Sequence, residues 1–91
     1  MIYKLFSMPA CPKCTEVKEF LKHSAVRGEE RSLAEPEGLM EMRKLYPKIR
    51  NMITRSEDGS MPIPTVVFYD KDNIAAVASS VLEIEKIVKA A

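Results

Sequence analysis

The chain has 91 residues, of which 46% are hydrophobic and 30% are charged, and its formal net charge is +1. This size fits one sheet with helices packed against it. The near-zero charge argues against nucleic acid or an acidic membrane surface as a partner, and no apolar run of about 18 residues could span a bilayer. We expect a monomeric, cytoplasmic protein with one domain over residues 1–91, since the N-terminal segment lacks the apolar region of a signal peptide.

The first half of the chain predicts two strands and two helical regions. Residues 1–6 are apolar and partly aromatic, which is typical of a strand, and residues 15–23 have apolar positions at helical spacing. Residues 29–33 are charged enough to form an edge strand. A helical region begins near residue 35, and Pro47 is expected to break or restart it. The side chains expected on its buried face are Leu39, Met42, Leu45, Tyr46, Ile49, Met52 and Ile53.

The second half predicts a hairpin followed by a helix. Residues 55–60 are expected to form a loop, and residues 65–69 are β-branched and aromatic, which indicates a strand. A turn at residues 70–73 leads to a returning strand over residues 74–77. Ser80-Val-Leu-Glu83 has the form of a capping box at the start of the last helix. The predicted order of elements is therefore β-α-β-α-β-β-α.

Both cysteines of the chain lie in Cys11-Pro12-Lys13-Cys14, at the turn between the first strand and the first helix. Pro12 suits the first helical position. The helix N-terminus and Lys13 both favour an anion, and thiols in such settings have a pKa of roughly 3.5–7.5, compared with ~8.5 for free cysteine. We expect Cys11 to be partly or largely thiolate and Cys14 to remain a thiol. The pair is then suited to thiol–disulfide exchange, with Cys11 as the nucleophile and Cys14 as the resolving cysteine.

Two other roles are compatible with the same cysteines. The CxxC pair supplies two of the four ligands of a structural metal site, so a zinc or iron–sulfur module would need Cys11 and Cys14 from each of two chains. His23 is the only histidine, and it is expected about two turns from Cys14 in a structural role. The third hypothesis is an interaction domain whose cysteines only report the redox state.

At these residues the sequence resembles the glutaredoxins of the thioredoxin superfamily. Cys11-Pro-Lys-Cys14 is similar to their CPxC motif, and Ile63-Pro64-Thr65 is similar to the superfamily's cis-proline segment. The resemblance covers nearly the whole chain. It implies an α/β thioredoxin-like fold, with a four-stranded mixed sheet flanked by helices and, here, an extended second helical region. It also implies a cis peptide bond before Pro64, with Pro64 packed against the Cys11 sulfur.

The same resemblance implies where a substrate binds. The backbone of Ile63 would pair with an extended substrate, and N–H groups near the start of the last helix would receive a carboxylate. No metal ligand is implied. The expected substrate-binding residues are Pro12, Lys13, Ile63, Pro64, Thr65, Ser79 and Ser80.

Several family features are missing. The buried Asp of many thioredoxins is replaced by Leu5, and Met8 stands where glutaredoxins often carry a basic residue. The glutaredoxin turn that holds glutathione aligns with residues 75–79, which offer no carboxylate. We therefore expect no tightly bound cofactor and only weak glutathione binding, with Lys13 and Arg50 as candidate replacements. The expected partners are a protein or small-molecule disulfide and a reductant, either glutathione or a thioredoxin-reductase-type enzyme.

Overall fold

The computed structural model describes residues 1–53, 59 and 62–90. Its elements are β1 (Ile2–Ser7), α1 (Pro12–Lys22), β2 (Arg27–Ser32), α2 (Pro36–Ile49), β3 (Thr65–Asp70), β4 (Asn73–Ala78) and α3 (Val81–Ala90). This is the order of elements that the sequence predicts. Apart from Gly59, the loop predicted over residues 55–60 lies outside the described residues. None of the described helices is long and apolar enough to cross a bilayer.

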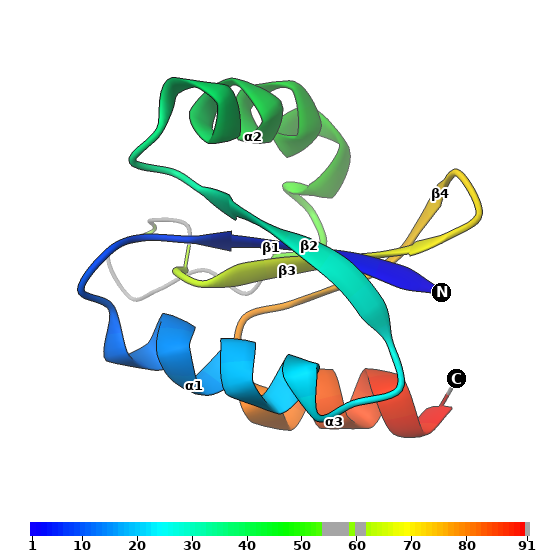
Figure 1. The fold of residues 1–91 in the computed structure, drawn as a ribbon. Helices are drawn as coiled ribbons and strands as arrows, with labels where there is room; N and C mark the ends of the chain where they lie inside the picture. Colours follow the sequence, from blue (N-terminus) through cyan, green and yellow to red (C-terminus); the bar gives the residue numbers. More distant parts are fainter. Residues whose placement is uncertain (54–58, 60–61, 91) are drawn as a thin grey trace.

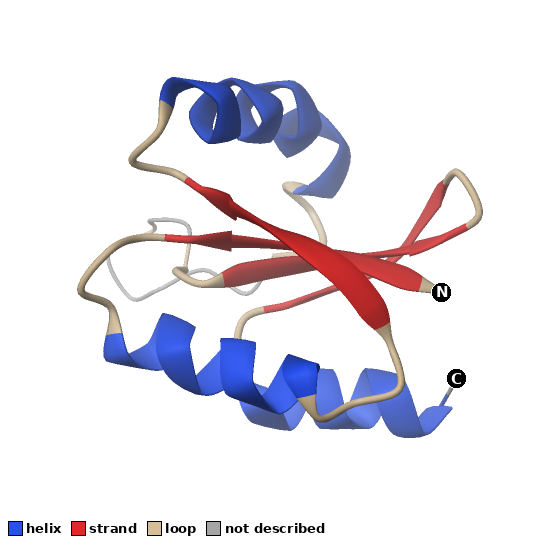
Figure 2. Cartoon of the chain, viewed as in Figure 1, coloured by secondary structure: helices blue, strands red, loops and turns tan. Residues whose placement is uncertain are grey.

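The strands form a mixed sheet in the order β2-β1-β3-β4. β1 and β2 are parallel, whereas β3 is antiparallel to both β1 and β4. Figure 1 shows α2 on one face of the sheet and α1 with α3 on the other. The same view coloured by secondary structure separates these three layers clearly (Figure 2). The prediction of a four-stranded mixed sheet flanked by helices is thus confirmed.

Each face of the sheet has its own apolar core. Neighbouring strand residues point to opposite faces, so Leu5 packs toward α1 and α3, whereas Phe6 packs toward α2. The core on the α1 and α3 side consists of Leu5, Val17, Leu21, Val66, Phe68, Ala78 and Ile84. The core on the α2 side consists of Phe6, Met42, Leu45, Ile49 and Val67.

The second helical region differs from its prediction. Pro47 does not break α2, which continues to Ile49. Because Pro47 is exposed and lies in the last turn, its missing N–H removes at most one bond near the helix end, while buried Ile49 anchors that turn. The region is also shorter than expected, since residues 50–52 form a turn. Leu39 and Met52, which were expected to be buried, are 38% and 42% exposed.

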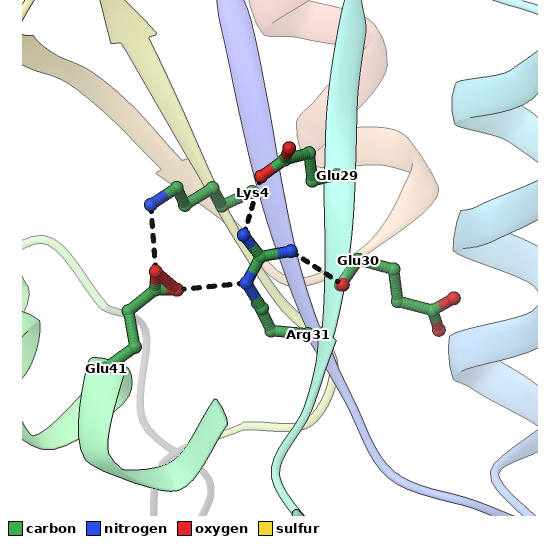
Figure 3. A network of polar contacts seen from close by, with 5 residues as sticks. All are labelled: Lys4, Glu29, Glu30, Arg31 and Glu41. Carbon is green, nitrogen blue, oxygen red and sulfur yellow. Dashed lines mark hydrogen bonds and ion pairs between the residues drawn. The ribbon is translucent and has the colours of Figure 1, made fainter. Parts of the chain in front are cut away.

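Charged side chains hold α2 against β1 and β2 (Figure 3). Glu41 of α2 accepts a hydrogen bond from Lys4 Nζ of β1 at 2.9 Å. Its other oxygen lies 3.5 Å from Arg31 Nε of β2, and Arg31 also pairs with Glu29 at 2.7 Å. These half-exposed charges join the helix to two strands at the rim of the apolar core.

Candidate active site

The CPKC segment lies at the junction between β1 and α1. Cys11 is the N-cap residue of α1, with extended backbone angles, and Pro12 occupies the first turn as predicted. The sulfur of Cys11 accepts a hydrogen bond from the backbone N–H of Cys14 at 3.1 Å. An N–H group at a helix N-terminus directed at the sulfur favours negative charge there. The start of α1 therefore offers the Cys11 sulfur a backbone hydrogen-bond donor.

The two sulfurs differ in access, and the pKa of Cys14 is raised. Cys11 is half-buried, whereas Cys14 is only 5% exposed. Burial, followed by the hydrogen bond with Cys11, raises the pKa of Cys14 to about 11, against a lowering contribution from the Met8 backbone. Cys14 is therefore a thiol at neutral pH. One sulfur of the pair is open to a substrate, and the other is enclosed and protonated.

The turn before Cys11 has one unusual backbone conformation. Ala10 has φ = 55°, in the left-handed region, which costs a residue with a Cβ about 1–2 kcal/mol. This conformation lets the chain leave β1 at Ser7 and enter α1 within four residues. The fold thus holds Cys11 at the helix start although Ala10 must adopt a backbone conformation that alanine disfavours.

The predicted cis-proline segment lies at the same end of the sheet. The Ile63–Pro64 peptide bond is cis, as expected, and Thr65 pairs with Phe6 near the end of β1. Both Pro64 and Thr65 are fully buried, and Thr65 Oγ1 donates to the Pro62 carbonyl at 2.7 Å. These two side chains hold the segment in place. Ile63 is half-buried, so part of it remains accessible to a substrate.

Lys13 and the start of α3 are the other two predicted contact regions. Lys13 is exposed and forms no hydrogen bond or ion pair among the described residues, so its charge is available to an incoming anion. At α3, Ser80 Oγ accepts the Glu83 N–H, while the Glu83 carboxylate accepts the Ser79 N–H, each at 3.3 Å. The Ser80 half of the predicted capping box is confirmed, whereas the Glu83 carboxylate bonds to the N–H of Ser79 and not to that of Ser80. Because the Glu83 carboxylate accepts the Ser79 N–H, this N–H group is already hydrogen-bonded within the chain.

A polar depression that the sequence did not reveal lies beside the CPKC turn. It has a volume of about 260 Å³ and is lined by Ser7, Met8, Pro9, Glu30, Ser32 and Glu35. Glu30 Oε2 accepts a hydrogen bond from Ser7 Oγ at 2.7 Å, and Oε1 pairs with Lys18 at 2.8 Å. The bond to Lys18, then the bond to Ser7, lowers the pKa of Glu30. Only the register of β2 against β1 brings this carboxylate to the site, and local sequence pattern does not report register.

The described part of the chain contains no group of three or more His, Cys, Asp or Glu side chains able to hold a metal ion. His23 lies at the C-terminal end of α1 with an 83% exposed side chain, next to Glu19. A metal site shared by two chains would have to take both sulfurs of each CPKC segment. The burial of Cys14 opposes that arrangement, because a residue that is only 5% exposed offers little surface to a metal shared with a second chain.

Together, the mixed sheet, the cysteine pair at the start of α1 and the cis-proline before β3 define a thioredoxin-like protein. The glutaredoxin family model matches residues 3–72, which include both motifs. The chain belongs to the glutaredoxin family.

Two solved structures show the same fold over nearly the whole chain. The thioredoxin-like protein BC3987 is 25% identical, with a TM-score of 0.60 over 93% of this chain and 97% of that one. A mutant of BC3987 is 26% identical, with a TM-score of 0.59 over 92% and 95%. A search of curated proteins gives no match. These similarities support a thiol oxidoreductase fold and leave the reaction itself to be argued from the site.

Proposed function

We propose that this protein is a small thiol–disulfide oxidoreductase that reduces disulfides with the Cys11–Cys14 dithiol. The observation that carries the proposal is the asymmetry of the pair. Cys11 is accessible and its sulfur accepts a helix N-terminal N–H, whereas Cys14 is enclosed and protonated. In such a pair, one cysteine is the nucleophile that attacks an external disulfide. The other is two residues away in the CxxC motif, which is close enough to form an internal disulfide with it afterwards.

In the first step, the Cys11 thiolate attacks one sulfur of the substrate disulfide. A Cys11–substrate disulfide forms as the substrate S–S bond breaks, and the departing thiolate takes a proton from water. Lys13, exposed on the same turn, favours negative charge near Cys11 during the approach. The backbone of half-buried Ile63 is the proposed partner for an extended stretch of the substrate.

In the second step, Cys14 gives up its proton and attacks the Cys11 sulfur. The second substrate thiolate leaves, and a Cys11–Cys14 disulfide remains. The substrate has then gained two electrons and the dithiol has lost two. Because the pKa of Cys14 is raised to about 11, its proton must be removed before or during this attack.

We propose that the substrate is a protein or small-molecule disulfide in the cytoplasm. The reductant that restores the dithiol is either glutathione or a thioredoxin-reductase-type enzyme. Three features favour a weak role for glutathione. Met8 offers no positive charge. The polar depression, with Glu30 and Glu35, and the Glu83 carboxylate both oppose a ligand that carries two carboxylates.

Trapping the intermediate tests the proposal. Cys14→Ser should accumulate a stable mixed disulfide through Cys11 when mixed with a disulfide substrate, and mass spectrometry should show the adduct. Cys11→Ser should form none, and the native chain should instead accumulate the internal disulfide. If the native chain and Cys14→Ser accumulate the adduct equally, Cys14 does not resolve it. Turnover by Cys11→Ser at the native rate would refute the proposed nucleophile.

A further inference from the structure

The two edges of the sheet differ sharply in charge. β2 forms one edge, and four of its six residues are charged (Arg27, Glu29, Glu30 and Arg31). β4 forms the other edge with the sequence Asn-Ile-Ala-Ala-Val-Ala, which contains no charge and no proline. Charged residues, prolines and β-bulges are the usual means by which an edge strand avoids pairing with another chain. β2 is protected by its charges. β4 has no charge and no proline, and its pairing with β3 is irregular at one position, Ala75, because Phe68 pairs with Ala76 and Tyr69 pairs with Ile74.

A cavity also lies along the unpaired edge of β4. A cavity of about 440 Å³ is lined by Met52, Ala75, Ala76, Val77, Glu83, Lys86 and Ile87. Three consecutive residues of β4 contribute, together with Met52 after α2 and one side of α3. Because α2 and α3 lie on opposite faces of the sheet (Figure 1), the cavity follows the edge of the sheet between them. The exposed side chain of Ala75 is small enough for another backbone to approach closely.

Two opposite charges of α3 border this cavity with unused bonding capacity. Lys86 is exposed and forms no ion pair among the described residues. Glu83 forms no ion pair there either, and its bonds to Ser79 and Ser80 use Oε1 alone. A surface that carries both signs side by side is complementary to itself when it is turned about a two-fold axis.

We propose that β4 is a homodimer interface, in which the β4 strands of two copies pair antiparallel and join two sheets into one. In a two-fold pair, residue i of one copy contacts residue j of the other, and the reverse contact forms as well. Glu83 of each copy then faces Lys86 of the other, below the paired strands. The neutral edge supplies backbone hydrogen bonds, and the two charge pairs set the orientation.

This dimer does not involve the cysteines. Cys11 follows β1, and β3 separates β1 from β4 in the sheet. The inference therefore does not depend on the dithiol chemistry, although the interface shares Glu83 with the start of α3, where a glutathione carboxylate would approach. It departs from the monomer expected from the sequence, because composition does not show that one sheet edge is left uncharged.

Sedimentation equilibrium of the full chain under dithiothreitol tests the proposal first. The native chain should pass from one to two chain masses with a dissociation constant below about 1 mM. Ala75→Lys places a charge on the edge and should weaken association at least tenfold. Ala25→Lys is the matched control on an exposed residue between α1 and β2, and it should associate like the native chain. A native chain that stays monomeric, or Ala75→Lys that dimerises normally, would overturn the proposal and leave the edge to a different partner.

Charge reversal tests the orientation. Glu83→Lys alone and Lys86→Glu alone each bring like charges together twice in a homodimer, so each should associate at least tenfold more weakly than the native chain. An equimolar mixture of the two variants should recover association, because every facing pair is then opposite in charge. Circular dichroism checks that Glu83→Lys, which loses its cap contacts, still folds. If the mixture associates no better than its components, the proposed orientation is wrong. If Glu83→Lys does not fold, weaker association of both Lys86→Glu and Ala75→Lys than of the native chain still supports the interface, and native association of both overturns it.

Discussion

Gly38 is the position where a single methyl group should disturb the fold most directly. It is a buried residue of α2 that faces the end of β2. A Cβ added there would lie 2.9 Å from the Ser32 carbonyl carbon, 3.3 Å from the Ser32 nitrogen, and closer still to the Ser32 oxygen. All three atoms belong to backbone, so no side chain can rotate away. The helix itself would have to move from the strand.

Two opposing contributions set the size of the effect. Overpacking costs about 1–3 kcal/mol, and the backbone obstacle favours the upper end. Alanine in place of glycine returns roughly 1 kcal/mol of helix propensity. We expect Gly38→Ala to lower the free energy of unfolding by about 2 kcal/mol and Tm by roughly 8–16 °C. Met40→Ala, on the exposed side of the same helix, should change Tm little. If Gly38→Ala is as stable as the native chain, α2 does not approach β2 this closely.

Three further predictions follow from individual residues. Iodoacetamide at neutral pH should label Cys11 and spare Cys14, because Cys14 is buried and its pKa is raised to about 11; equal labelling of both by mass spectrometry would contradict this. Glu30→Gln should destabilise the protein by less than about 1 kcal/mol at neutral pH, since the pair with Lys18 is partly exposed. The pKa of Glu30 is lowered in the folded state, so this stability is present above the unfolded pKa of ~4.3 and is lost as the pH falls through the folded value; a difference from the native chain that persists below both values would refute it. Lys71 has φ = 58° in the hairpin turn, so Lys71→Gly should stabilise by roughly 0.5–1 kcal/mol, whereas Asp72→Gly should not; thermal unfolding distinguishes them.

The sequence predicted the elements whose signals are local. The CPKC turn is such a case, because proline at the first helical position and a helical apolar pattern behind it need no distant partner. The cis bond at Ile63–Pro64 was expected from resemblance to the superfamily and is present. The capping box at Ser80 was predicted from two residues three positions apart. The bond from the Glu83 N–H to Ser80 confirms half of it, while the Glu83 carboxylate accepts the N–H of Ser79.

The parts that the sequence missed depend on tertiary context. Pro47 should end a helix by local rules, yet the packing of Ile49 keeps the last turn of α2 in place. Met52 continues the apolar spacing of the helix, but the helix has ended by then and the side chain is exposed. Glu30 reads as one more charge on an edge strand. Its place beside the CPKC turn follows from β2 lying parallel to β1, with Glu30 opposite Leu5.

We predict that the charge of Glu83 limits glutathione as a partner. Glutathione brings two carboxylates and one ammonium group, and two lost charge-assisted contacts at roughly 1.5–3 kcal/mol each would weaken binding by about two to four powers of ten. At α3, a ligand carboxylate would meet the Glu83 carboxylate, which already accepts the Ser79 N–H. Glu83→Gln removes that negative charge and should lower the KM for glutathione in a coupled turnover assay. Glu85→Gln is the control, since Glu85 pairs with Lys89 on the same helix and lines a different cavity. An unchanged KM in Glu83→Gln, or an equal fall in Glu85→Gln, would show that repulsion by Glu83 is not what keeps glutathione away.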